Sequence, residues 1–131
     1  MVPIDLSKQA EDLAQTCYGL SIAVDNFRIA NYAVLSQERR DDLKAQSEAL
    51  ATRGQAFTAE ALGAILQRIQ PHLASIKQAT QAAQDALAHL NDVAKGITIV
   101  DSAVTLVGSI ATCDVASILE NVQSLFETVR S

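Results

Sequence analysis

The chain has 131 residues, of which 49% are hydrophobic and only 4% aromatic, and its formal net charge is -5. A chain of this length buries enough apolar surface to fold alone, so we expect one domain over residues 1–131 that needs no metal or disulfide. Its acidity disfavours nucleic acid and anionic membrane surfaces as partners, because both require an excess of positive charge on the protein.

Helix breakers are scarce, with five glycines and two prolines in the whole chain. This composition predicts an all-α protein. The first residues, MVPIDLSKQAEDL, carry neither the basic nor the apolar part of a secretory signal, so we expect a cytoplasmic protein. Cys17 and Cys113 lack the spacing of a metal site, and we expect them to behave as small apolar side chains. A disulfide between them is the alternative.

Glycines that directly follow basic residues are typical of helix C-termini, and here Gly54 follows Arg53 and Gly96 follows Lys95. They predict three helical stretches, roughly 5–53, 58–95 and 98–130. The candidate N-caps are Asp5, Thr58 and either Thr98 or Asp101. Asp114 is a further candidate cap, for the segment from Val115 to Val129.

Apolar residues in the first stretch recur in steps of four and three, and then change phase near Ser36. The regular positions are Leu6, Ala10, Leu13, Cys17, Leu20, Val24, Phe27, Asn31 and Val34. Either one long helix bends at a four-residue stutter, or Ser36 caps a separate second helix. Residues 37–53 hold four acids and four bases, which indicates a solvated helix attached through a narrow apolar seam.

The second stretch keeps the same spacing from Leu62 to Ile97, directly through Pro71. This periodicity is typical of a coiled-coil-like bundle, and it favours a kink at Pro71 over a helix end there. An unbroken helix of this length would span about 54 Å, whereas a compact globule of this size is about 36 Å across. The sequence therefore predicts an elongated antiparallel bundle of three to five helices, kinked near Pro71.

The segment 97–111 is apolar on every helical face and carries a single charge, Asp101. Its main apolar residues are Ile97, Ile99, Val104, Val107 and Ile110. A central core helix and a membrane-inserting segment both fit this composition, but about fifteen residues fall short of the roughly 20 that a transmembrane helix needs. We favour the core helix.

The sequence contains no glycine-rich phosphate loop and no local hydrolase or metalloprotease motif. Its two histidines, His72 and His89, point in different directions on one helix. Asp85, His89 and Asp92 share a helix face at a spacing that suits metal ligands, but this face lies beside the apolar seam and we expect it to be solvated. We therefore predict no catalytic, metal or cofactor site and identify no small-molecule substrate.

The middle of the first helix carries a second apolar stripe on the side opposite the seam, formed by Tyr18, Ile22, Ile29 and Ala33. Either the chain's own helices cover this stripe, or another subunit does. Asn31 interrupts the main seam, where a polar residue can fix helix register or can simply lie near the water-exposed end of the bundle.

These features favour a non-enzymatic helical interaction or scaffold module that associates with itself or with a protein partner through apolar helix faces. A membrane-active protein that inserts segment 97–111 is one alternative. Another is a bundle that binds a small apolar ligand between its helices, where Ala79, Ala83 and Ala86 would leave room.

Overall fold

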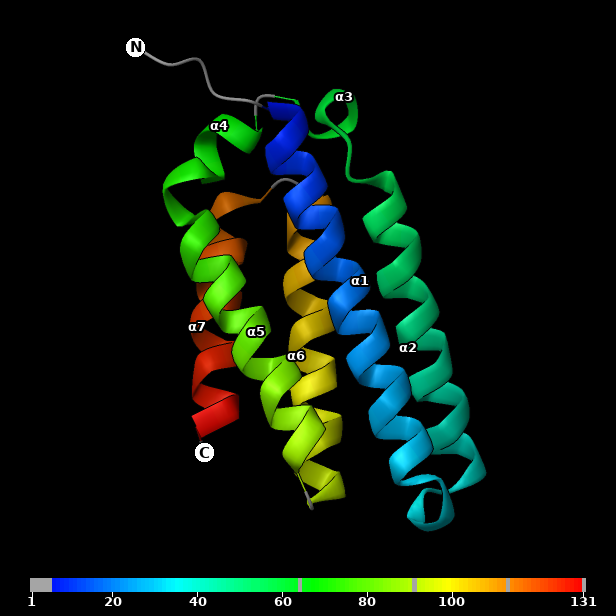
Figure 1. Ribbon diagram of the computed structural model, residues 1–131. Helices are drawn as coiled ribbons and strands as arrows, with labels where there is room; N and C mark the ends of the chain where they lie inside the picture. Colours follow the sequence, from blue (N-terminus) through cyan, green and yellow to red (C-terminus); the bar gives the residue numbers. More distant parts are fainter. Residues whose placement is uncertain (1–5, 64, 91, 113, 131) are drawn as a thin grey trace.

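The computed structural model describes residues 6–63, 65–90, 92–112 and 114–130, and the predicted cap Asp5 lies outside them. The fold is all-α, as predicted, with five long helices packed against each other (Figure 1). The long helices are α1 (Leu6–Ala30), α2 (Gln37–Ala56), α5 (Leu73–His89), α6 (Val93–Ala111) and α7 (Val115–Arg130). The short elements are α3 (Ala59–Leu62), α4 (Ile65–Ile69) and the 3-10 helices η1 (Tyr32–Val34) and η2 (Gln70–His72).

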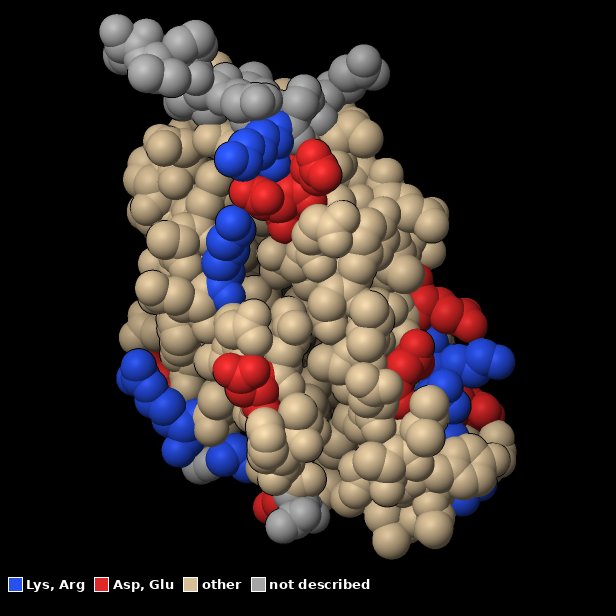
Figure 2. All heavy atoms as spheres, viewed as in Figure 1, with Lys and Arg blue, Asp and Glu red and all other residues tan. Residues whose placement is uncertain are grey.

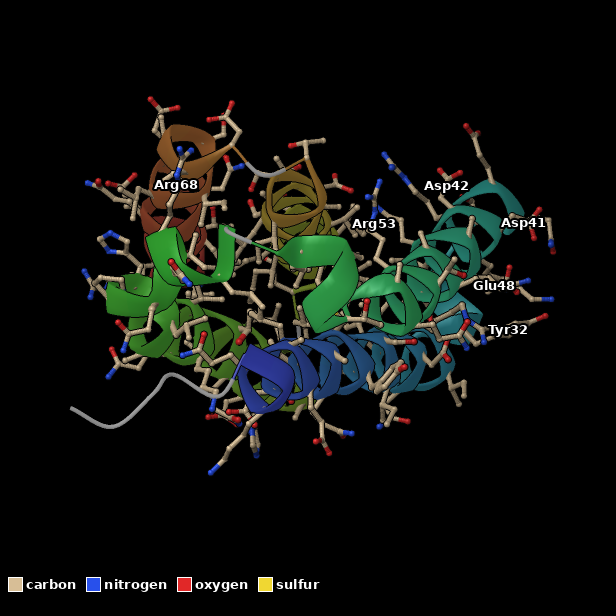
Figure 3. The ribbon with its side chains drawn as sticks, turned by 90° about the horizontal axis from the view of Figure 1, so that it is seen from above. Tyr32, Asp41, Asp42, Glu48, Arg53 and Arg68 are labelled. Carbon is tan, nitrogen blue, oxygen red and sulfur yellow. The ribbon has the colours of Figure 1, made fainter. Side chains whose placement is uncertain are left out.

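Consecutive long helices run in opposite directions along a common axis (Figure 1). The helix α1 descends, α2 returns, α3 and α4 cross the upper end, and α5, α6 and α7 then run down, up and down. The longest helix, α1, has 25 residues, which corresponds to about 37 Å at 1.5 Å per residue. The α1–α2 pair leans away from the other helices toward its lower end, as Figures 1 and 3 both show.

The first predicted stretch is two helices, with Ser36 as the N-cap of the second. The Ser36 hydroxyl accepts a hydrogen bond from the Arg39 N–H at 3.2 Å. Between the helices, the carbonyl of Asn31 accepts from the N–H groups of both Val34 and Leu35. This 3-10 turn changes the phase of the chain, so that Leu35 is 5% exposed and Val34, placed on the seam by the sequence pattern, is 72% exposed.

Gly54 and Gly96 do not end helices, in contrast to the prediction. Both lie inside helices, where they allow another side chain to approach closely. A Cβ atom on Gly96 would overlap the Phe27 ring, and one on Gly54 would lie 3.1 Å from the Cβ of Cys17. These two glycines are therefore required by packing between helices and not by helix termination.

The predicted continuous helix over 58–95 is broken at two places and turned at a third. Thr58 caps α3, as predicted, by accepting from the Ala61 N–H at 3.1 Å, but Gly63 follows with a φ of 51°. Pro71 lies in η2, where the chain turns from α4 into α5 (Figure 1). Leu90 is extended, and Asp92 caps α6 in place of Thr98 or Asp101.

The helix α6 forms the centre of the bundle, since it contacts each of the other four long helices. This explains why segment 97–111 is so apolar: a helix with neighbours on most sides buries most of its surface. The residues at most 2% exposed are Ile99, Val100, Ala103, Leu106, Val107 and Ile110, while Ile97 and Val104 pack partly buried against them. A narrow outer strip is polar, contrary to the sequence analysis, and contains Thr98, Asp101 and Thr105.

By length and composition alone, α6 also qualifies as a candidate membrane span, with a mean hydropathy of 1.5. The core helix of a bundle passes the same test. In this fold its largest apolar side chains face the other helices and its exposed strip is polar, which is the arrangement of a core helix.

The helix α2 lies at the edge of the bundle, and its long-helix contacts are with α1 and α6. Its buried residues are Leu43, Ser47, Leu50 and Gly54, which follow one another in steps of four, three and four. In the view along the bundle, Asp41, Asp42 and Glu48 point outward (Figure 3). The predicted solvated helix with a narrow seam is confirmed.

Candidate functional site

Among the described residues, large apolar side chains are exposed mainly on the second half of α1 and on the η1 turn. Five such side chains are strongly exposed in the described part of the chain, and four of them lie within residues 22–34. Their exposed fractions are 61% for Ile22, 63% for Ile29, 50% for Tyr32 and 72% for Val34. We refer to these four residues and the exposed Ala33 as the apolar ridge. Figure 2 shows uncharged side chains over this lower end of the α1–α2 pair, with charged groups along its border.

The stripe that the sequence pattern places on α1 is exposed over part of its length and covered over the rest. Ile22, Ile29 and Ala33 are exposed, so none of the helices that the structure describes covers them. Tyr18, in contrast, is partly buried and packs against Gly54 of α2. The helix α2 therefore covers the stripe at Tyr18, whereas the part of the stripe from Ile22 to Ala33 is exposed to solvent.

Tyr32 and Val34 were not among the predicted surface residues. The sequence pattern places Val34 on the buried seam because it continues the helical spacing past Ala30, where α1 actually ends. The signal that would have located the turn is Ser36, since an N-cap serine requires the preceding residues to leave the helix.

The turn that carries the ridge is held in one conformation by Asn31 and Arg40. The Asn31 side-chain amide donates to the Phe27 carbonyl at 2.9 Å, which supports its role at the end of the bundle. The Arg40 Nε donates to the Tyr32 carbonyl at 2.9 Å, and its guanidinium lies 3.8 Å from the centre of the Tyr32 ring. The side chain of Leu35, which directly follows the turn, is buried in the hydrophobic core. The ridge is thus a preorganised surface.

Charge is evenly balanced in the segment of the chain that carries the ridge, and the acidic excess lies in the other segments. Residues 22–44 contain four acidic and four basic residues, so the whole net charge of -5 lies outside this segment. Within it, Arg28 and Asp25 form an ion pair at 3.5 Å. A partner of strong positive or negative charge therefore gains little from this end of the molecule.

A shallow hollow of about 250 Å³ adjoins the ridge between α1 and α5, and Ile22 forms part of its wall. Gly19, Asn26, Gln84 and Ala88 also line it. The hollow is open to solvent and is lined by small, apolar and amide groups together with the carboxylate of Asp85. It extends the surface on which a partner's side chains can pack beside the ridge.

The candidate metal ligands Asp85, His89 and Asp92 do not share a helix, because α5 ends at His89. The His89 Nδ1 is hydrogen bonded to the Asp85 carbonyl at 2.9 Å. Asp92 caps α6 by accepting from the Lys95 N–H at 3.1 Å. Among the residues that the structure describes, no three His, Cys, Asp or Glu side chains are grouped to hold a metal ion.

The remaining candidate positions lie in the core. Ala79 and Ala83 are fully buried, and Ala86 packs partly buried against the same cluster. Cys17 is a free, buried thiol whose pKa burial raises to about 12, against a smaller lowering by Arg53. Its predicted alternative partner, Cys113, lies outside the described residues.

Comparison with known proteins found no matching family model, no matching curated protein and no matching solved structure.

Proposed function

We propose that this protein is a non-enzymatic helical interaction module that binds another protein surface through the apolar ridge. The observation that carries the proposal is that four of the five strongly exposed large apolar side chains of the described residues, Ile22, Ile29, Tyr32 and Val34, lie on the second half of α1 and the η1 turn. Isolated exposed apolar residues are ordinary in soluble proteins, but a contiguous group marks an interaction site.

The size of the ridge sets the strength of the interaction. Burying a whole Val or Ile side chain contributes about 1.5–3 kcal/mol, and each ridge residue has half or more of that surface still to bury. Four such residues contribute roughly 4–6 kcal/mol before the cost of association is subtracted. Contacts at the charged border and in the neighbouring hollow would add to this sum. We therefore expect a reversible complex in the micromolar range.

The fixed η1 turn supports the same function. A surface that is already ordered before binding loses little conformational entropy when a partner packs against it. The hydrogen bond and ring contact of Arg40 with Tyr32 hold the turn without occupying Ile29 or Val34. The side chains of Ile29 and Val34 are therefore exposed to a partner, whereas the Tyr32 ring already has Arg40 over it.

Site-specific photo-cross-linking tests this proposal. A photoreactive amino acid at Ile29 should give one dominant adduct in cells, and its partner peptide should map to one segment of one protein. The matched control is the same group at Leu119 of α7, which is 40% exposed and lies outside the ridge. Unmodified protein should compete for the Ile29 adduct. Adducts of equal yield and diversity at both positions would contradict a docking role for the ridge.

Insertion of α6 into a membrane is the alternative that its composition suggests. It requires Ile99, Leu106 and their buried neighbours to leave the bundle centre, which would expose apolar surface on all four surrounding helices. The folded arrangement favours the interaction module, because the ridge is available without any such rearrangement.

A further inference from the structure

We infer that the occupant of the apolar ridge is the ridge of a second copy of this chain, so that the protein forms a two-fold symmetric dimer. This inference rests on the proposed function and names its partner. A two-fold interface brings the same patch of two subunits together, so the patch must be complementary to itself. Its charge and its polar groups both satisfy that condition.

The charge distribution favours contact at this end of the molecule. Two copies carry -5 each, and approach through most of their surface brings like charges together. Residues 22–44 have no net charge, with acidic and basic residues in equal number. Contact through this segment keeps most of the acidic remainder of each subunit away from the interface, with Asp85, which lines the hollow beside Ile22, at its border. A highly basic partner, in contrast, would be attracted to the acidic remainder and not to the ridge.

The polar groups of the ridge can be satisfied by their own counterparts. Asn26 is exposed and lies between Ile22 and Ile29, four residues after one and three before the other. An amide both donates and accepts hydrogen bonds, so two copies of Asn26 can pair across a two-fold axis. An asparagine in an apolar helix seam is a known means of fixing register and oligomeric state. The phenol of Tyr32 is likewise a donor and an acceptor.

The experiment is sedimentation equilibrium of the full chain up to a concentration of about 500 µM, well above the expected micromolar dissociation constant. We expect a monomer–dimer equilibrium. Ile29→Asp and Val34→Asp should each weaken the dimer at least about tenfold, because they place two negative charges opposite each other. The control Leu119→Asp adds the same charge outside the ridge and should leave the equilibrium unchanged. Circular dichroism verifies that each variant is folded.

Salt provides an independent measurement. Because the contacting segment has no net charge, the dissociation constant should stay the same or decrease between about 0.05 and 0.5 M salt, as repulsion between the acidic remainders is screened. A dimer held by opposite charges would weaken at least tenfold, and that result would overturn the inference.

Three further results would overturn it. The first is a monomer at every concentration, and the second is a dimer that Leu119→Asp weakens as much as Val34→Asp does. The third is flotation of the wild-type chain with neutral phosphatidylcholine vesicles that Val34→Asp abolishes, since the ridge would then bind lipid. If the Ile29 cross-link identifies a different protein while the purified chain stays monomeric, the proposed interaction module stands and the second-copy inference fails.

Discussion

Ser21 of α1 and Ser47 of α2 exchange hydrogen bonds across the buried interface between their helices. The Ser21 hydroxyl donates to the Ser47 carbonyl at 2.9 Å, and the Ser47 hydroxyl donates to the Ser21 carbonyl at 3.1 Å. The two hydroxyl oxygens are 3.0 Å apart. Because Leu43 and Leu50 are the large apolar side chains that α2 buries, this reciprocal pair contributes to the register in which α2 lies against α1.

We expect Ser21→Ala and Ser47→Ala each to lower the free energy of unfolding by about 1 kcal/mol, since each removes a buried hydrogen bond. The double variant should lose less than the sum of the two, because the contact between the two hydroxyl oxygens, 3.0 Å apart, is already absent in either single variant, although each backbone acceptor remains. Chemical denaturation of the four proteins measures this coupling. Strict additivity would show that the two hydroxyls act independently. A serine-to-alanine change at Ser117 cannot serve as the surface control for these variants, because the Ser117 hydroxyl donates a hydrogen bond to Asp114.

Two glycines of α6 should respond in opposite ways to alanine. Gly96→Ala should lower stability by about 1–3 kcal/mol, because the added Cβ overlaps the Phe27 ring in a packed core. Gly108→Ala should raise it by about 0.5–1 kcal/mol, since a Cβ there meets no atom within 4 Å and alanine favours the helix. Thermal melting distinguishes the two. In a Phe27→Leu background, Gly96→Ala should lower the stability by less than it does in the wild-type chain. An equal loss in both backgrounds would show that the steric overlap is not with the Phe27 ring.

Cys17 should be unreactive in the folded protein. In a Cys113→Ser variant, an aromatic disulfide reagent at pH 8 should modify Cys17 only after denaturant is added, because burial raises the pKa of the thiol to about 12. The folded pKa lies above the free-thiol value of 9.0, so the associated stability is present below pH 9.0 and is lost as the pH rises toward 12. A Cys17→Ala chain should lack this component of the alkaline loss. Rapid modification of native protein would contradict the buried position.

Asp114 should make the stability of α7 depend on acid pH. Its carboxylate accepts from the Ser117 N–H at 3.2 Å and from the Ser117 hydroxyl at 2.9 Å, and these bonds hold its pKa below the usual 3.8. The folded pKa is lowered, so this stability is present above pH 3.8 and is lost as the pH falls below it. Asp114→Asn keeps a capping oxygen without the charge and should remove that pH dependence. Asp114→Ala should weaken α7 at neutral pH as well.

The central position of α6 predicts a strong difference between its two sides. Val107→Asp should unfold the protein, because Val107 is 1% exposed and a buried unpaired carboxylate costs several kcal/mol. Thr98→Asp places the same charge on the exposed strip and should be tolerated. Circular dichroism gives the result. If the folded wild-type chain causes vesicle leakage and Val107→Asp stays folded while abolishing it, α6 acts in lipid and not as the core.

Local chemistry was sufficient to predict that the chain is helical and to predict several helix caps, although not the ends of every helix. The hydroxyls of Ser36 and Thr58 and the carboxylate of Asp114 cap the helices that follow them, because capping joins groups only three residues apart. Steps of four and three also identified the buried positions from Leu66 to Leu87, even though Pro71 and η2 interrupt the helix between them. Capping and helical spacing depend on residues that are close together in the chain, so both can be predicted from the sequence alone.

The interaction surface could be predicted only in part, because exposure depends on which helices lie beside a residue. The sequence pattern places Ile22 and Ile29 on a second apolar stripe. The neighbouring sequence does not indicate that α2 covers Tyr18 and leaves Ile22 and Ile29 exposed to solvent. Glycine gives the clearest example of this limit. Gly96 follows a lysine as a helix-ending glycine would, and only the packing of Phe27 against α6 makes it an interior residue. Helix formation is decided within a few residues, whereas burial is decided by segments far apart in the chain that meet only in the folded protein.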